Sequence, residues 1–246
     1  MKIDKLPRKA SLPTVLAICI LLGRTAGLRA QPAPAEKSID APNGQTISIK
    51  VIGPVTQTTD LQIVCILKHD SGGDKYIEAM EDFNKKLHSL LSGIRDRGEF
   101  TGELGETLLF TPPAGAIAPK QVLLIGIGDE ADITLDKLQL VGEIAAREAV
   151  RLGAAEVSFA PTLRDQGSTR VDVGDGDAAF ATGWILAFDT EKKLVIQGLS
   201  PSANVETLTI EAGPKYFDGV VSKVTDAAEK ATAMVHDRSA SAYMSN

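Results

Sequence analysis

Two short loops carry residues that could bind or activate a ligand. The first follows an apolar run at 61–67 and contains His69, Asp70, Gly72 and Gly73. The second closes an apolar run that begins at 121 and contains Gly126, Gly128 and Asp129. Histidine and carboxylate side chains can exchange protons, and a glycine turn before a helix can approach a phosphate. These residues are the candidate ligand-loop positions of the chain.

The second loop also has a simpler interpretation as a tight turn between a strand and a helix. It lacks the third glycine of the G-x-G-x-x-G pattern, because Ala131 occupies that position. Asp129, Glu130 and Asp132 would repel a phosphate group. The pattern therefore favours a structural turn over a nucleotide site.

The sequence holds no recognisable motif for metal or nucleophilic catalysis. His69, His88 and His236 stand in different predicted elements, and neither H-E-x-x-H nor G-x-S-x-G occurs. Cys65 lies inside an apolar run, so we expect a buried thiol that behaves as a small hydrophobe. We predict no catalytic residue, no metal ligand and no cofactor.

Three aspartates stand close together at Asp172, Asp175 and Asp177. Their spacing differs from that of an EF-hand loop, and no Glu follows at the twelfth position. One of them suffices to cap the helix that follows, which favours a helix cap over a calcium site.

These residues must be positioned by alternating strands and helices. Apolar residues that run continuously or alternate predict strands at 46–51, 61–67, 106–110, 121–127, 156–160 and 205–210. Apolar residues three or four apart predict helices at 77–91, 134–152, 175–188 and 216–236. Because apolar strands need helices on both faces, we expect an α/β fold. It would have three layers, α/β/α, and a mixed, largely parallel sheet.

Residues 1–30 have the pattern of a Sec-type signal peptide, with cleavage as late as 35. A basic start precedes a short apolar run at 12–22, which is too short to span a bilayer. We therefore predict a periplasmic or secreted protein that keeps no stable membrane anchor after cleavage. The predicted segments are a signal peptide at 1–30, a flexible stretch at 31–45, an α/β domain at 46–212, and a linker-type helix and tail at 213–246.

Composition and charge narrow the class of partner. The chain has 246 residues, of which 43% are hydrophobic and 24% charged, which excludes disordered and collagen-like classes. The formal net charge of −6 becomes −11 once residues 1–30, with six basic residues and one acidic residue, are removed. This acidity disfavours nucleic acid as a partner.

Two segments together resemble the N-terminal domain of the leucyl (cytosol) aminopeptidase family. Residues 100–109, FTGELGETLL, match the family's F-x-G-x-x-G-E pattern, and residues 120–128, KQVLLIGIG, resemble its glycine-ended strand. Residues 181–189 and the end of the 216–238 helix resemble later parts of the same domain. The residues that carry the motif are Gly102, Gly105, Glu106, Gly126 and Gly128.

The resemblance implies a macro-domain-like fold without the family's chemistry. Family members continue into a catalytic domain that holds two metal ions and contains an N-T-D-A-E-G-R segment. That segment does not occur in this sequence, and Asn246 stands where the catalytic domain would begin. We therefore expect no peptidase activity from this chain by itself.

Three functions are compatible with these observations. The leading hypothesis is an exported, non-catalytic domain that acts through self-association or contacts with a protein partner, by oligomerisation or regulation of a peptidase. The second is a macro-type module that binds ADP-ribose or a similar nucleotide at the His69 and Gly126 loops. The third is a subunit of a split metalloaminopeptidase, whose catalytic chain is encoded separately.

Overall fold

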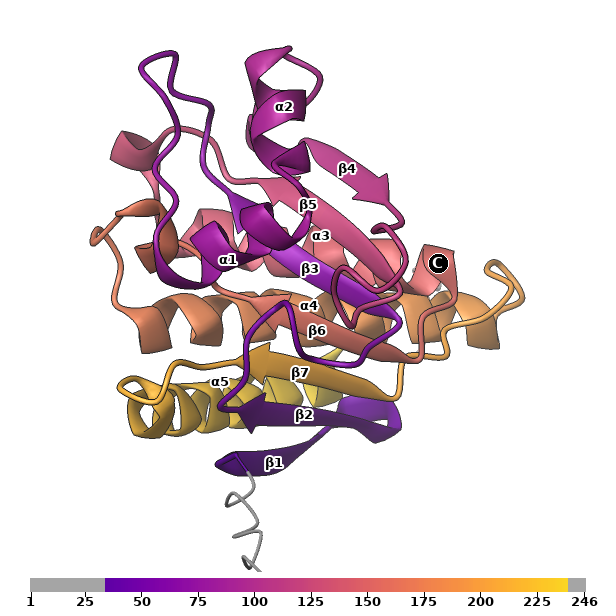
Figure 1. The fold of residues 1–246 in the computed structure, drawn as a ribbon. Helices are drawn as coiled ribbons and strands as arrows, with labels where there is room; N and C mark the ends of the chain where they lie inside the picture. Colours follow the sequence, from indigo (N-terminus) through magenta and orange to yellow (C-terminus); the bar gives the residue numbers. More distant parts are fainter. Residues whose placement is uncertain (1–33, 239–246) are drawn as a thin grey trace, which may run out of the picture. The chain divides into compact units, whose positions relative to one another are not determined.

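The structure is a computed structural model that describes residues 34–238. The predicted signal peptide and the residues after 238 lie outside this range. Seven strands form one sheet in the order β1-β2-β7-β6-β3-β5-β4 (Figure 1). In chain order the strands are β1 (Glu36–Ala41), β2 (Gln45–Lys50), β3 (Leu61–Ile66), β4 (Thr107–Phe110), β5 (Gln121–Gly126), β6 (Glu156–Ala160) and β7 (Thr207–Glu211).

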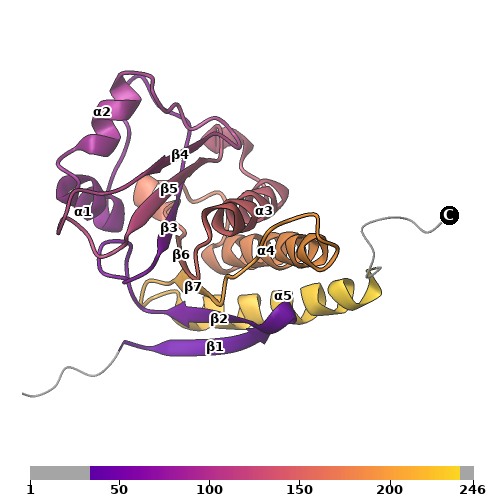
Figure 2. The ribbon, with the colours of Figure 1, turned by 90° about the vertical axis from the view of Figure 1, so that its right-hand side faces the viewer.

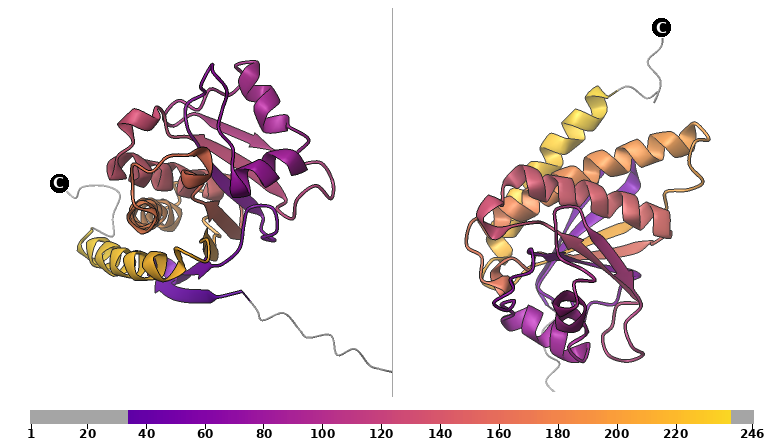
Figure 3. Two further views of the ribbon diagram at one scale, coloured as in Figure 1. Left: turned by 60° about the vertical axis from the view of Figure 1, so that its left-hand side comes forward. Right: turned by 90° about the horizontal axis from the view of Figure 1, so that it is seen from above.

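Five α-helices cover the sheet on both faces. They are α1 (Glu78–Lys86), α2 (Leu90–Asp96), α3 (Leu135–Leu152), α4 (Val173–Ile196) and α5 (Phe217–Asp237), with short 3-10 turns η1 (Pro42–Gly44), η2 (Glu130–Asp132) and η3 (Arg164–Gln166). Helices α3, α4 and α5 lie on one face, and α1 and α2 lie on the other (Figures 2 and 3). The predicted α/β/α class is confirmed.

The sheet is mixed but largely parallel. Strands β2, β7, β6, β3 and β5 run in one direction, and the two edge strands β1 and β4 are antiparallel to their neighbours. The carboxyl ends of the five parallel strands therefore meet at one edge of the sheet. In α/β folds this edge is where ligands bind.

The apolar core has two parts, one on each face of the sheet. The larger part packs beneath α3, α4 and α5, where the rings of Phe159 and Phe180 stack with centroids 3.6 Å apart. The smaller part packs α1 and α2 onto β3 and β5. On α5, Val220, Val224, Ala228 and Ala231 are buried against this core, and Phe217 and Val235 at the two ends of the stripe are partly buried against it.

Two predicted helix boundaries are confirmed by their caps. Thr134 Oγ1 accepts a hydrogen bond from the Lys137 amide at the start of α3. Gly153 closes that helix with φ +69°, a left-handed conformation that glycine adopts without a steric penalty. Helix α4 is longer than its apolar stripe predicted, because its last residues extend beyond the core.

The single helix predicted at 77–91 is wrong, since the chain forms two helices there. His88 and Ser89 have φ values of 55° and 62°, which interrupt the helix between α1 and α2. The amide of Asn84 bridges the break by donating to Ser92 Oγ over 2.8 Å. The break lets residues on both short helices reach the same apolar cluster. The three-to-four-residue spacing of apolar residues continues across the break, so this spacing alone predicts one helix.

The sequence predicts a flexible stretch at 31–45, but this stretch contains β1 and η1. Residues 36–41 pair with β2 along its whole length. The polar composition of this stretch concealed the strand, because one face of an edge strand is solvated.

Candidate functional site

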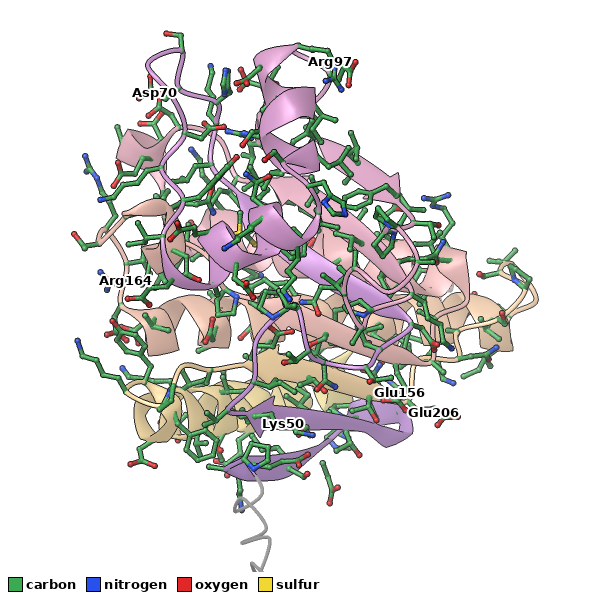
Figure 4. All side chains as sticks on the ribbon, in the orientation of Figure 1. Lys50, Asp70, Arg97, Glu156, Arg164 and Glu206 are labelled. Atoms are coloured by element: carbon green, nitrogen blue, oxygen red, sulfur yellow. The ribbon has the colours of Figure 1, made fainter. Side chains whose placement is uncertain are left out.

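A cavity of about 620 Å³ opens at the carboxyl edge of the sheet beside β3. The segment after β3 lines it from Leu67 to Lys75, apart from Gly72, and the loop after β5 contributes Asp129 and Glu130. The turn η3 closes the third side with Gln166 and Gly167. We call this space the β3 cavity; Asp70 is labelled beside it in Figure 4.

Asp74 organises the loop that forms the β3 cavity. The buried guanidinium of Arg95 binds both carboxylate oxygens of Asp74, and Tyr76 donates its hydroxyl over 3.0 Å. His69 Nδ1 lies 3.1 Å from the same carboxylate. Burial opposes ionisation of Asp74, but the hydrogen bonds from Arg95 and its other neighbours outweigh burial and lower its pKa to about 2.

This arrangement makes Asp74 an anchor rather than a catalytic base. A carboxylate with so low a pKa accepts a proton poorly near neutral pH. Its oxygens are also occupied by donors from three side chains. His69 and Asp74 therefore resemble a catalytic dyad in spacing, while their contacts are those of a loop support.

Gln166 ties the β3 cavity to the sheet. Its side-chain oxygen accepts the Leu67 amide over 2.9 Å, and its nitrogen donates to the Cys65 carbonyl over 2.9 Å. Thr162 donates to the same carbonyl of Cys65 over 2.5 Å. At the end of β3, the side chains of Gln166 and Thr162 therefore bind backbone groups that have no strand partner there.

The family-motif residue Glu106 holds the loop before β4. Its carboxylate accepts the amides of Thr101, Gly102 and Glu103, and it accepts the Thr101 hydroxyl over 2.7 Å. Burial alone would raise the pKa of Glu106, but these hydrogen bonds outweigh burial and lower the pKa. Glu106 therefore fixes the conformation of its own loop by binding the loop's backbone amides.

The motif glycines allow that loop to lie against the end of β5. A Cβ on Gly126 would approach the Glu103 carbonyl oxygen to 2.1 Å, and one on Gly102 would approach the Leu67 carbonyl oxygen to 2.4 Å. Gly105 and Gly128 have φ values of 80° and 79°. Each of these positions excludes an ordinary side chain, by contact or by conformation.

The candidate residues from the sequence divide into two groups. His69, Asp70, Gly73 and Asp129 line the β3 cavity. Gly72, Gly126 and Gly128 are not among its lining residues; they belong to the turns that support it.

Sequence reasoning missed Asp74, Arg95 and Gln166. Asp74 stands among other acids in a polar loop, and Arg95 lies in a helix where one basic residue is ordinary. Their importance comes from burial and from long-range pairing, which no local pattern reveals.

A second cavity, of about 480 Å³, lies at the same edge beyond β6 and β7. It is lined by residues after β2, by the start of α1, by the loop after β6 and by Glu211 to Tyr216. We call it the β7 cavity. Arg164, one of its lining residues, and Asp70 are labelled at one end of the sheet, and Glu156 and Glu206 at the other (Figure 4).

The three aspartates at the start of α4 do not converge on one point. Asp172 accepts the Asp175 amide as a helix cap, and Asp175 pairs with Lys223 at 2.7 Å. Asp177 is buried, which raises its pKa well above the ordinary value. Burial likewise raises the pKa of the Cys65 thiol, as expected for an inert core cysteine.

Residues 34–238 contain neither a metal-binding cluster nor a membrane-spanning helix. No three His, Cys, Asp or Glu side chains in this range are grouped so that they could hold a metal ion. Within the same range, no helix combines the length and the apolar character needed to cross a bilayer.

Comparison with known proteins relates this architecture to one family. Residues 66–186 match the model of the cytosol aminopeptidase family, N-terminal domain. A probable cytosol aminopeptidase from Roseiflexus castenholzii is 27% identical over 121 residues, which cover 49% of this chain and 22% of that protein. This chain thus spans about a fifth of its curated relative.

Two solved structures share the fold. A tomato leucine aminopeptidase variant superposes with a TM-score of 0.57 and 21% identity, over 82% of this chain and 38% of that one. The Oceanobacillus iheyensis macrodomain, in a structure with MES bound, superposes with a TM-score of 0.54 and 13% identity. That match covers 80% of this chain and 99% of the macrodomain. The expected macro-domain-like fold is confirmed.

Proposed function

We propose that this chain, whose residues 66–186 match the model of the cytosol aminopeptidase family's N-terminal domain, is an exported, non-catalytic domain that works through protein–protein contacts. Self-association is the contact that we expect first. Regulation of a peptidase is the role we propose for the resulting assembly.

The use of the family-motif residues supports a non-catalytic role. The Glu106 carboxylate accepts hydrogen bonds from three backbone amides and one hydroxyl of its own loop. Gly102 and Gly126 lack a side chain where another backbone segment approaches closely. These motif residues therefore build the domain, and they leave no free group for chemistry at the motif.

An exposed apolar patch supports the proposal of protein contacts. Leu104, Leu109 and Leu140 are 39%, 37% and 38% exposed. Leu109 faces the α3 side of the edge strand β4, because its neighbours Leu108 and Phe110 pack, partly buried, against the core on the other face. Ile144 lies one turn after Leu140 on α3 and beside Gly105. We call the three exposed leucines, Leu104, Leu109 and Leu140, the β4 patch; Ile144 itself is partly buried against the core.

The position of the β4 patch suits association. Figure 2 shows β4 at the edge of the sheet, where it has a neighbour on one side. An edge strand offers unpaired backbone groups, and a neighbouring apolar patch offers area to bury. A second copy of the domain or a peptidase surface could use both features.

A peptidase assay tests the non-catalytic part of the proposal. Purified protein is incubated with leucine p-nitroanilide in the presence of Mn²⁺ or Zn²⁺. We expect no release of p-nitroaniline above the rate in buffer. Metal-stimulated turnover that copurifies with the protein would overturn the proposal.

The fold likeness to a macrodomain favours a second candidate function, nucleotide binding. Structures of the Oceanobacillus iheyensis macrodomain include one with ADP and one of a variant with ADPR, with TM-scores of 0.50 and 0.51. The β3 cavity, at the carboxyl edge, has a volume suited to a small molecule. Its lining acids, which include Asp70, Asp129 and Glu130, oppose an anionic ligand.

Calorimetry separates the two functions. Titration of ADP-ribose into the protein should give no saturable heat if the domain acts only through protein contacts. Saturable binding that is lost in Lys75→Glu, which reverses a positive charge in the cavity lining, but kept in the control Lys230→Glu on the exposed side of α5, would establish the second function instead. Capture of a stoichiometric peptidase from a periplasmic extract would favour a split aminopeptidase.

A further inference from the structure

The outer edge of β4 offers backbone hydrogen-bonding groups on alternate residues. An amide at the end of β5 donates to the Glu106 carbonyl over 2.8 Å. Antiparallel pairs that exchange such bonds recur at every second residue, so Leu108 and Phe110 also point their N–H and C=O groups at β5. The residues between them, Thr107 and Leu109, point theirs away from the sheet.

The side chains of β4 are incompletely covered on both faces of the sheet. Thr107, Leu109 and Thr111 alternate along the chain, and all three are exposed on the α3 side. On the other face, Leu108 and Phe110 are only partly buried against the core. A strand placed beside β4 would therefore pair its outward backbone groups and cover apolar side chains on both faces at once.

The chain on either side of β4 limits the length that can pair. Pro112 and Pro113 follow the strand, and a proline has no N–H to donate to a ladder. Before the strand, Gly105 has a φ of 80°, so the chain leaves the extended path there. Residues 107–111 are the whole length available for pairing.

A second copy of the chain presents the same five-residue edge and fits it in one register. When two identical strands pair antiparallel with Leu109 opposite Leu109, Thr107 of each copy lies opposite Thr111 of the other. This register uses the available length fully in both copies. A shift in either direction sets a proline or the bend at Gly105 against the partner strand.

Charges on α3 suit the same two-fold arrangement. An axis perpendicular to the sheet sets the α3 helices of the two copies antiparallel on one face of the joined sheet (Figure 2). The chain at 129–137, which leads into α3, carries four acids and one lysine. The last turns of α3 carry Arg147 and Arg151, which are 48% and 64% exposed. The acidic start of each helix therefore lies on the side of the basic end of the other.

We propose that a second copy of this chain occupies the edge of β4, by two-fold antiparallel pairing of β4 with β4 centred on Leu109. The two sheets join into one continuous sheet. The Leu109 side chains of the two copies lie side by side on the α3 face, and Leu108 of each copy lies beside Phe110 of the other on the opposite face. This inference rests on the proposed self-association and adds its symmetry and register.

Cysteine cross-linking of the whole protein tests the register. In the proposed pairing the Cα atoms of the two Leu109 residues lie about 5.5 Å apart, within the range that a disulfide can bridge. Leu109→Cys should therefore form a covalent dimer under mild oxidation with copper phenanthroline, seen on a non-reducing gel. The native Cys65 is 1% exposed, so the unmodified protein gives the background.

Two further variants distinguish this register from other contacts at the same edge. Thr107 is exposed on the same face as Leu109, but its two copies would be offset by about 13 Å along the strands. Thr107→Cys should therefore give no dimer above background. Thr107→Cys combined with Thr111→Cys should cross-link, and it keeps Leu109 in place. Cross-linking of Thr107→Cys alone, or its absence from both other variants, would overturn the register.

Light scattering of the unmodified protein separates failure of the register from failure of self-association. A mass of two chains together with the expected cross-links supports the pairing. A mass of several chains without those cross-links would overturn the register and leave self-association standing. A single-chain mass at every concentration, without cross-links in any variant, would overturn both.

Discussion

Four donors converge on the carboxylate of Glu106, and none of them lies outside its own loop. Three are the consecutive amides of Thr101, Gly102 and Glu103, and one is the Thr101 hydroxyl. At the scale of the residue, a family motif is thus explained by a local hydrogen-bond network. The same reasoning makes Glu106 more sensitive to substitution than an exposed acid nearby.

Glu106→Gln should destabilise the domain by about 1–3 kcal/mol, because an amide nitrogen would face backbone donors. Glu103→Gln is the matched control, since its ion pair with Lys68 is exposed to solvent and adds little stability. Urea unfolding of both variants measures the difference. Equal losses for the two variants would show that the loop network adds no stability.

The buried acids give the domain a characteristic dependence on pH. Glu211 has a pKa of about 7 in the folded protein against an ordinary value of 4.5. A carboxyl group with a raised pKa contributes most stability below its ordinary value and loses that contribution as pH rises through the folded value. Asp165, with a pKa of about 6, acts in the same direction.

Glu211→Gln should therefore keep the fold but change how the free energy of unfolding depends on pH. The free energy of unfolding of the unmodified protein should fall between about pH 5 and pH 8, by roughly 3 kcal/mol from Glu211. The variant should lose much of this decline, whereas Glu206→Gln should follow the unmodified protein. Parallel profiles for all three proteins would contradict the burial of an ionisable Glu211.

At the scale of the elements, two glycines set the distance between α3 and α4. A Cβ on Gly183 would approach the Gln139 carbonyl oxygen to 2.0 Å, and one on Gly142 would approach the Phe180 carbonyl oxygen to 2.1 Å. Each helix thus presents a glycine to the backbone of the other. Gly183 also lies in the segment 181–189 that resembles the family, so this contact explains part of the resemblance.

Gly183→Ala should destabilise the domain by about 1–3 kcal/mol, although alanine is the better helix former. Gly219→Ala in α5 is the control, because no atom lies within 4 Å of the added methyl group. We expect that variant to be neutral or up to about 1 kcal/mol more stable. Thermal unfolding compares the two, and a stabilised Gly183→Ala would mean that the helices do not meet at this point.

Periodic patterns predicted most elements, and they failed where backbone conformation decided the outcome. The run at 121–127 and the stripe at 134–152 are long and apolar, so burial alone identifies β5 and α3. The break at His88 and Ser89 leaves the apolar spacing intact and is therefore invisible to periodicity. The strand β1 was missed because its exposed residues lack a strong alternation.

The sequence predicts where the candidate site lies, but it does not predict which side chains pair with one another there. The position of His69 after a buried strand indicated the carboxyl edge of the sheet, and the cavity lies there. The pairing of Asp74 with Arg95 joins residues 21 positions apart, and Glu211 meets Ser158 across 53. Such partners depend on the sheet order, which the sequence alone does not specify.

At the scale of the whole molecule, the described domain is complete in its core and open at one edge. Both faces of the sheet are covered, including by α5, while the β4 patch leaves three leucines more than a third exposed. We propose that the domain functions through contacts made at β4.

Size-exclusion chromatography with light scattering tests this central claim most directly. We expect the purified protein to have a mass that is a multiple of one chain, and Leu109→Lys to shift it to the mass of a single chain. Leu199→Lys, which changes a leucine that is 52% exposed between α4 and β7, should leave the assembly intact. A single-chain mass for the unmodified protein, or an assembly that Leu109→Lys leaves unchanged, would contradict association through β4.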